Sequence, residues 1–156
     1  GPQIKTAPPA AGQMPKETPG PILATFTDEN KAAIFKNYIA IKTALVNTNA
    51  AQASLHASKL IAVLPNTHAE ETLLQAAQHI VESNTVETQR AQFVVLTKGV
   101  EALLKDAVAQ GTIYKQYCPM AFGNSGASWL NESKAIRNPY FGDKMLKCGR
   151  IEATIK

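Results

Sequence analysis

The chain has 156 residues, of which 45% are hydrophobic and only 6% aromatic, and its formal net charge is +4. This length accommodates one domain with its own core, the small and aliphatic side chains favour packed helices, and no apolar run approaches the about 18 residues of a membrane-spanning helix. The excess of positive charge lies after residue 111, where seven Lys and Arg accompany three Asp and Glu. These cations are scattered singly, which argues against a nucleic-acid partner.

Residues 1–25 hold six of the nine prolines, mixed with Ala, Gly, Thr and Gln. Such a composition is typical of an extended, flexible tail or linker. We expect the single folded domain to occupy residues 26–156, with the more apolar end of the tail, residues 22–26, packed on it.

Four segments between Thr27 and Gly111 have apolar side chains three or four residues apart, which is the pattern of a helix with one buried face. The predicted buried residues are Ile34, Tyr38, Ile41 and Leu45; Ala53, Ala57, Leu60, Ile61 and Leu64; Leu73, Leu74, Ala77, Ile80 and Val81; and Val86, Phe93, Leu96, Val100, Leu103, Leu104 and Ala107. Because short turns make neighbouring helices antiparallel, we expect an up-down four-helix bundle.

Polar residues mark the expected helix ends. Asn49 with Gln52 predicts a capping pair for the second helix, while Thr67–Glu70 and Asn84–Glu87 predict capping boxes for the third and fourth. Gly111 is expected as the C-cap of the fourth helix.

After Gly111 the sequence pattern changes. Residues 112–118 are rich in β-branched and aromatic residues, residues 138–143 form a predicted turn, and residues 151–155 alternate like a strand. We therefore expect a mostly α fold whose residues 112–156 form a small irregular or two-stranded cap. Trp129, Tyr140 and Phe141 are expected to pack this cap onto the bundle. The alternative is that they form an exposed patch for a partner protein.

Both cysteines lie in the cap, and each has a methionine close by. Cys118 and Met120 are two residues apart, so on a strand they share a face, and Met145 and Cys148 are three apart, as on one helical turn. If the two segments converge, these four residues form a site suited to Cu(I), Ag(I) or another soft ion.

A disulfide between Cys118 and Cys148 is the alternative, since cysteines of exported domains usually pair. The bridge would stabilise the fold by about 3.5 kcal/mol, and Met120 and Met145 would then be packing residues. The chain would in that case be a structural or protein-interaction module without a metal. A site that is bridged when oxidised and binds metal when reduced is also consistent with these residues.

No catalytic constellation is evident in the sequence. It contains no glycine-rich phosphate loop after a strand, no His-Glu-x-x-His motif and no nucleophile elbow, and no base is placed to activate Cys118. His56, His68 and His79 lack the spacing of metal ligands. We therefore do not expect an enzyme.

Specific strings of residues occur at 117–121, 126–130 and 136–149, with further matches at 38–46 and 89–93. They resemble the DUF3347 family of bacterial envelope proteins, over roughly residues 30–152. The resemblance implies an exported, periplasmic or otherwise envelope-bound protein, whose signal peptide or lipid anchor would precede residue 1. Members also occur fused to adaptor subunits of copper/silver-type heavy-metal efflux systems. It thus implies a binding or chaperone module for copper-like ions, with an efflux adaptor or other envelope protein as partner.

Overall fold

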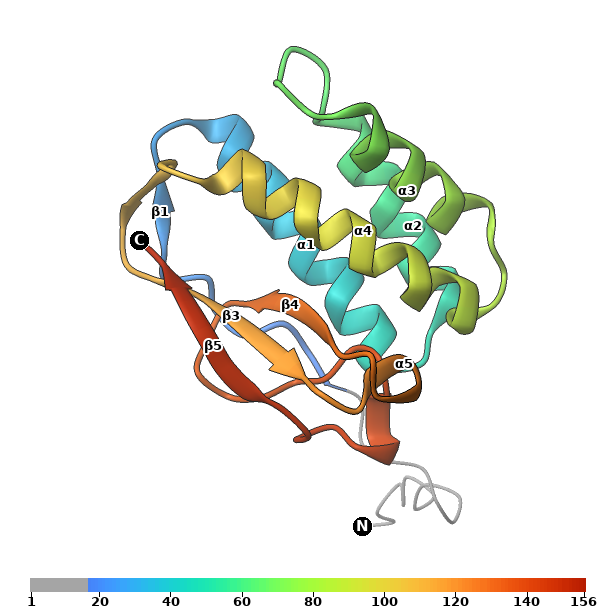
Figure 1. The fold of residues 1–156 in the computed structure, drawn as a ribbon. Coiled ribbons are helices and arrows are strands. Elements are labelled where there is room, and N and C mark those ends of the chain that lie inside the picture. The colour runs from blue at the N-terminus through green and yellow to red at the C-terminus, as the bar shows by residue number, and fades with distance from the viewer. Residues whose placement is uncertain (1–16) are drawn as a thin grey trace, which may run out of the picture.

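Four substantial helices dominate the computed structural model, which describes residues 17–156. They are α1 (Glu29–Val46), α2 (Ala50–Ala62), α3 (Glu71–Glu82) and α4 (Val86–Leu104). Each helix packs against the next, and α4 also packs against α1. Figure 1 shows α1 and α4 beside the strands, with α2 and α3 on the far side of them. The expected mostly α fold is confirmed at this level.

The predicted helix faces are buried with few exceptions. Ile34, Tyr38, Ile41 and Leu45 on α1 are fully buried, and the faces of the other helices join them in one core. Ile61, Leu74 and Val81 are only half-buried, at the edges of these faces. The part of the chain that the structure describes contains no helix long and apolar enough to cross a membrane.

The start of α2 is capped as expected, because the Asn49 side chain accepts a hydrogen bond from the Gln52 N–H at 3.1 Å. The capping box predicted at Thr67–Glu70 was wrong. Glu70 occupies the N-cap of α3 without a side-chain hydrogen bond. The Thr67 hydroxyl instead donates to the carbonyl of Leu64, so it serves the turn after α2.

The ends of α4 also differ from the expectation. Its N-cap is Thr85 rather than Asn84, and the Thr85 side chain accepts from the Thr88 N–H. The helix ends at Leu104, so Gly111 is not its C-cap. Gly111 has a φ of +83° next to the N-terminal segment, where a Cβ would lie 2.9 Å from the Cα of Ala24. Its absent side chain permits this close approach.

The cap contains more sheet than predicted. Strand β3 (Ile113–Cys118) lies between β4 (Ala127–Asn131) and β5 (Arg150–Ile155) in a three-stranded antiparallel sheet. A second antiparallel pair joins β1 (Thr25–Phe26) to β2 (Val108–Gln110). The expectation of an irregular or two-stranded cap was therefore wrong. The sequence of β4 has weak strand propensity, and its pairing with β3 and packing against α4 hold it extended.

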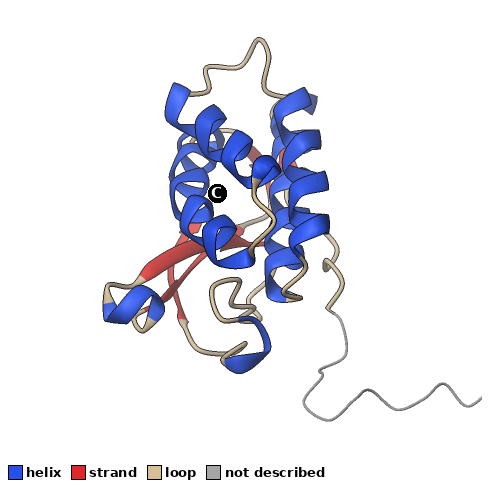
Figure 2. Ribbon diagram, turned by 90° about the vertical axis from the view of Figure 1, so that its right-hand side faces the viewer, coloured by secondary structure: helices blue, strands red, loops and turns tan. Residues whose placement is uncertain are grey.

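An aromatic junction joins the sheet to the helices. The hydroxyl of Tyr38 on α1 accepts a hydrogen bond from the Leu130 N–H at 2.9 Å and pairs with the Thr97 hydroxyl at 2.7 Å. Trp129 is fully buried and Tyr140 nearly so, and their ring centroids lie 6.0 Å apart. These two residues attach the cap to the bundle as expected. Figure 2 shows the strands gathered on one side of the helices.

The described part of the predicted tail lies against the domain. We call residues 17–24 the N-terminal strap. The backbone of Glu17 makes two hydrogen bonds with the side chain of Asn47, at 2.7 and 2.8 Å. The Gly20 N–H donates to Glu132 at 2.8 Å. Residues 1–16, the remainder of that tail, lie outside the described residues.

Candidate functional site

The two cysteines lie side by side. Cys118 is the last residue of β3 and Cys148 comes shortly before β5, and their sulfur atoms are 3.3 Å apart. Both are free thiols. Cys118 is fully buried, whereas Cys148 is half-buried. The soft-metal and disulfide predictions both require the two cysteine segments to meet, and the cysteines do meet.

The sheet register brings these residues together. Strands β3 and β5 are antiparallel, with Tyr117 opposite Arg150, so the next residue of β3 is Cys118 and the chain entering β5 carries Cys148. The Arg150 guanidinium carbon also lies 4.8 Å from the centre of the Tyr117 ring, which adds a cation–π contact beside the thiols.

Gly149 allows the chain to pass close to the sheet at this point. Its φ is +147°, and a Cβ there would lie 2.9 Å from the carbonyl oxygen of Tyr117 and 3.0 Å from the Trp129 ring. A side chain would push the loop away from the sheet. The position of Cys148 thus depends on the residue that follows it.

The loop before Cys148 is held by the buried residue Asn138. Its side-chain amide donates to the Cys148 carbonyl at 2.9 Å, and its backbone N–H donates to the Leu146 carbonyl at 2.8 Å. The Cys148 N–H in turn donates to the Met145 carbonyl at 3.0 Å. Asn138, at the start of the predicted turn, thus fixes the backbone of the loop that carries Cys148.

The thiol of Cys148 holds its proton more strongly than an ordinary cysteine. Its pKa is raised, first by the hydrogen bond to Cys118, then by burial and by the charge of the neighbouring sulfur. Two thiolates this close repel each other, so the pair loses its second proton with difficulty unless a cation or a bond joins the sulfurs.

The two methionines differ in exposure. Met120 follows Cys118 at the surface and is 47% exposed, immediately before the short helix α5 (Ala121–Asn124). Met145 is half-buried at the end of the 3-10 turn η1 (Gly142–Lys144). Met120 lies on the chain segment of Cys118, and Met145 on the segment of Cys148.

Additional ligands of other types are scarce near this pair. Within residues 17–156 there is no cluster of three or more His, Cys, Asp or Glu side chains that would hold a metal ion. The chemistry available is therefore that of two adjacent thiols, with thioethers as the candidate further donors.

Arg90 was missed by sequence reasoning as a residue that positions the site. From α4 its guanidinium donates to the Pro139 carbonyl at 2.7 Å and to the Leu45 carbonyl at 2.8 Å. It thereby fastens the 138–143 turn to the end of α1. An arginine on an otherwise helical surface carries no local sign of this role, and its place in the 89–93 string was the only available signal.

Lys42 was missed as well. It points from α1 to the sheet, where its ammonium donates to Glu132 at 2.8 Å and to Asn131 at 2.6 Å. Burial lowers the pKa of Lys42, while the Glu132 charge opposes that shift. A lysine next to the apolar stripe of α1 was the sequence signal for such a buried pair.

Comparison with known proteins gives one family. No curated protein and no solved structure matches the chain. The model of a family described as "Protein of unknown function (DUF3347)" matches residues 34–111, which is half of the chain and includes most of α1 and all of α2, α3 and α4. The chain therefore belongs to the DUF3347 family.

Proposed function

We propose that this domain binds a soft metal ion, Cu(I) or Ag(I), through the thiolates of Cys118 and Cys148. The observation that carries the proposal is the 3.3 Å between the two sulfur atoms, which come from segments 30 residues apart. Thiolate and thioether ligands favour such ions over Mg²⁺ or Ca²⁺.

The geometry needs little adjustment to hold an ion. Two thiolates bound at about 2.3 Å to one tetrahedral ion lie about 3.8 Å apart, so the sulfurs would separate by about 0.5 Å. Cys148 is half-buried and offers the approach, while Cys118 supplies a ligand shielded from water. A structural zinc site would need four Cys or His ligands, more than this pair and its described surroundings supply.

Met145 and Met120 are the proposed thioether ligands. The backbone carbonyl of Met145 accepts a hydrogen bond from the Cys148 N–H at 3.0 Å, which keeps the two residues in one turn of the chain. Met120 is exposed and two residues from Cys118, which suits a ligand that takes up the ion from outside.

The proposal extends to the setting that the family resemblance implies. We propose a binding or chaperone module, not an enzyme, in the bacterial envelope, with a heavy-metal efflux adaptor as its partner. The four helices, which we propose run alternately up and down, would then be the scaffold that carries the sulfur-bearing cap. The support for this setting is the soft-ion chemistry of the cysteine pair.

A disulfide staple is the second candidate, favoured by the complete burial of Cys118. A disulfide has an S–S bond of about 2.05 Å, so the sulfurs would approach by about 1.3 Å to form it. The bridge would connect β3 to the loop before β5 and stabilise the cap by about 3.5 kcal/mol.

A competition titration of reduced protein distinguishes these functions. Cu(I) or Ag(I) is titrated anaerobically against a chromophoric chelator, and one ion per chain is expected, with release of protons because the thiols must ionise. Cys118→Ser and Cys148→Ser should abolish this binding, and Met145→Leu should weaken it. Met14→Leu removes the methionine outside the cap and is the matched control.

Two outcomes would reject the metal function. One is a failure of reduced, folded protein to compete for the ion. The other is equal binding by the wild type and the Cys118→Ser variant. A thiol count of zero that persists at the reduction potential of a glutathione buffer would establish the staple instead.

A further inference from the structure

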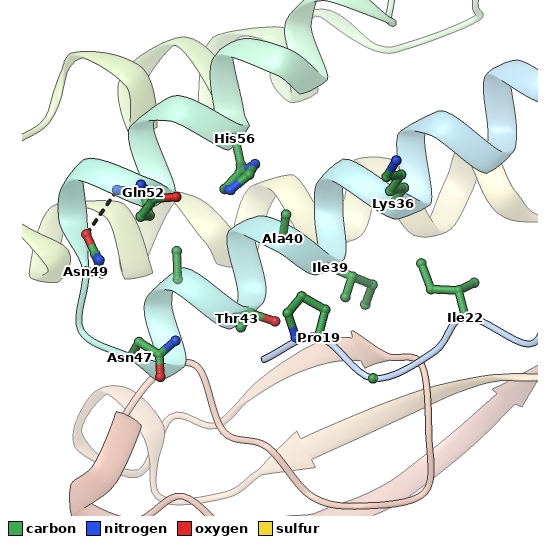
Figure 3. A pocket seen from close by; sticks show the side chains of 12 residues that line it. Pro19, Ile22, Lys36, Ile39, Ala40, Thr43, Asn47, Asn49, Gln52 and His56 are labelled. Carbon is green, nitrogen blue, oxygen red and sulfur yellow. Dashed lines mark hydrogen bonds between the residues drawn. The ribbon is translucent and has the colours of Figure 1, made fainter. Parts of the chain in front are cut away.

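A groove lies between α1, the start of α2 and the N-terminal strap. None of the proposed metal ligands Cys118, Met120, Met145 and Cys148 lines it. Its volume is about 510 Å³, within the range of pockets that hold small organic ligands. Figure 3 shows it running along α1 from Asn47 and Asn49 at one end to Lys36 and Ile22 at the other. Small residues on α1, Ala40 and Ala44, leave the space.

The middle of the groove contains a hydroxyl group that makes no hydrogen bond. Thr43 is 7% exposed, and its hydroxyl is buried without a hydrogen-bond partner among the described residues. A buried hydroxyl in this condition costs about 1–3 kcal/mol. In Figure 3 the Thr43 hydroxyl is directed to the side where Pro19 of the strap lies. Because proline has no N–H, moving this exposed residue aside loses no hydrogen bond from its nitrogen.

The described lining of the groove carries positive charge but no negative charge. Lys36 is exposed at one end and takes part in none of the ion pairs found among residues 17–156. None of the described lining residues is Asp or Glu. Burial, and then the charge of Lys59, lower the pKa of His56, so this residue faces the groove as a neutral hydrogen-bonding group near pH 7.

Apart from the side-chain amides of Asn47, Asn49 and Gln52 at one end, the remaining walls are aliphatic. Pro19 and Ile22 of the strap face Ile39 and Ala40 of α1 across the groove. An occupant therefore meets hydrocarbon along α1 and the strap, amide groups at one end and one positive charge at the other. When Pro19 moves aside it also meets the unpaired Thr43 hydroxyl.

We propose that this groove binds a small aliphatic monocarboxylate. The hydrocarbon chain lies between the strap and α1, and the carboxylate is attracted by Lys36 while one of its oxygens accepts a hydrogen bond from the Thr43 hydroxyl. Because one wall of the groove comes from the strap, the bound molecule also holds residues 19–22 against α1. The site is separate from the cysteine pair and does not depend on a metal function.

NMR titration of ¹⁵N-labelled protein with decanoate, below its micelle concentration, tests the proposal. We expect saturable shifts confined to the strap, to residues 36–44 and to the first turns of α2. Decanol, which has the same chain without the charge, should bind at least about tenfold more weakly.

Two substitutions assign the polar contacts. Lys36→Gln should weaken decanoate binding by about fivefold, as for an exposed ion pair. Thr43→Val should weaken it by about tenfold and at the same time raise the melting temperature, because it removes the unpaired hydroxyl. The opposite signs of these two effects separate a binding role from a structural one. Lys59→Gln removes an equal charge outside the lining and should leave the affinity unchanged.

Several results would overturn the assignment. They are the absence of saturable shifts, decanol binding as tightly as decanoate, and equal affinities for the wild type, Lys36→Gln and Thr43→Val. Shifts of the same residues that appear on raising the protein concentration, without decanoate, would identify a second copy of the chain as the occupant and would also overturn it.

Discussion

The side-chain amide of Asn138 donates a hydrogen bond to the backbone carbonyl of Cys148, with 2.9 Å between the nitrogen and the oxygen. The side-chain oxygen of Asn138 accepts a hydrogen bond from the Tyr140 N–H at 2.8 Å. Asn138 is fully buried, so water does not replace these partners. One side chain therefore fixes both the 138–143 turn and the backbone of the more accessible cysteine.

Replacement of Asn138 by Ala should destabilise the fold and loosen the cysteine pair. The Cys148 carbonyl and the Tyr140 N–H would lose their partners, and we expect the free energy of unfolding to fall by about 2–4 kcal/mol. Urea denaturation measures this loss, and a glutathione titration should show less favourable closure of the disulfide. Asn84→Ala, at an exposed asparagine, is the control and should change little. Equal losses in the two variants would contradict the role of Asn138.

Gly149→Ala should lower the stability of the fold more than the same change at another glycine with positive φ. A Cβ at Gly149 meets the Tyr117 carbonyl at 2.9 Å and the Trp129 ring at 3.0 Å, whereas a Cβ at Gly123 (φ +63°) meets nothing within 4 Å. We expect a loss of about 1–3 kcal/mol beyond that of Gly123→Ala. Thermal unfolding of the two variants side by side provides the measurement. Similar melting temperatures would show that the loop at Gly149 shifts to accommodate a side chain, which would contradict the prediction.

Replacing one partner of the buried ion pair between Lys42 and Glu132 should lower the free energy of unfolding more than replacing both partners. Both side chains are 3% exposed. Lys42→Met leaves Glu132 charged and unpaired, so we expect the free energy of unfolding to fall by about 3–5 kcal/mol. Lys42→Met with Glu132→Leu should restore only part of this loss, because Asn131 and the Gly20 N–H also lose a partner. A double-mutant cycle in urea measures the coupling. Lys31→Met, which breaks an exposed pair with Asp28, should cost less than about 1 kcal/mol.

Stability should fall in alkali because of two buried phenols. Burial raises the pKa of Tyr38 and of Tyr140 above the ordinary value of 10.0. Above about pH 10 the unfolded chain releases these protons and the folded chain keeps them, so the free energy of unfolding decreases as pH rises through this range. The slope should be about 1.4 kcal/mol per pH unit for each tyrosine.

Tyr38→Phe isolates half of this effect. It should reduce the alkaline slope of the urea-unfolding free energy by about 1.4 kcal/mol per pH unit. At neutral pH it should destabilise the fold, since the Leu130 N–H and the Thr97 hydroxyl lose their partner. An alkaline slope that Tyr38→Phe leaves unchanged would show that other groups cause the loss.

Much of the helical part was predictable because its signals are local. The apolar spacing of Ile34, Tyr38, Ile41 and Leu45 identified a buried face that the structure confirms. Capping was less predictable, since Thr67 has the residue type of an N-cap but its hydroxyl bonds back to Leu64. Strand β4 was missed as a strand because pairing with β3, rather than local propensity, keeps it extended.

By itself the sequence determined which helix faces are buried and which four residues of the cap carry soft sulfur, because periodicity and residue type are properties of short segments. Only the tertiary structure decided that Cys118 and Cys148 are neighbours, and that Lys42 meets Glu132, contacts between residues 30 and 90 positions apart. Such contacts depend on strand register and on the packing of sheet against helix. No local pattern encodes them, because their free energy is gained only when the whole domain closes.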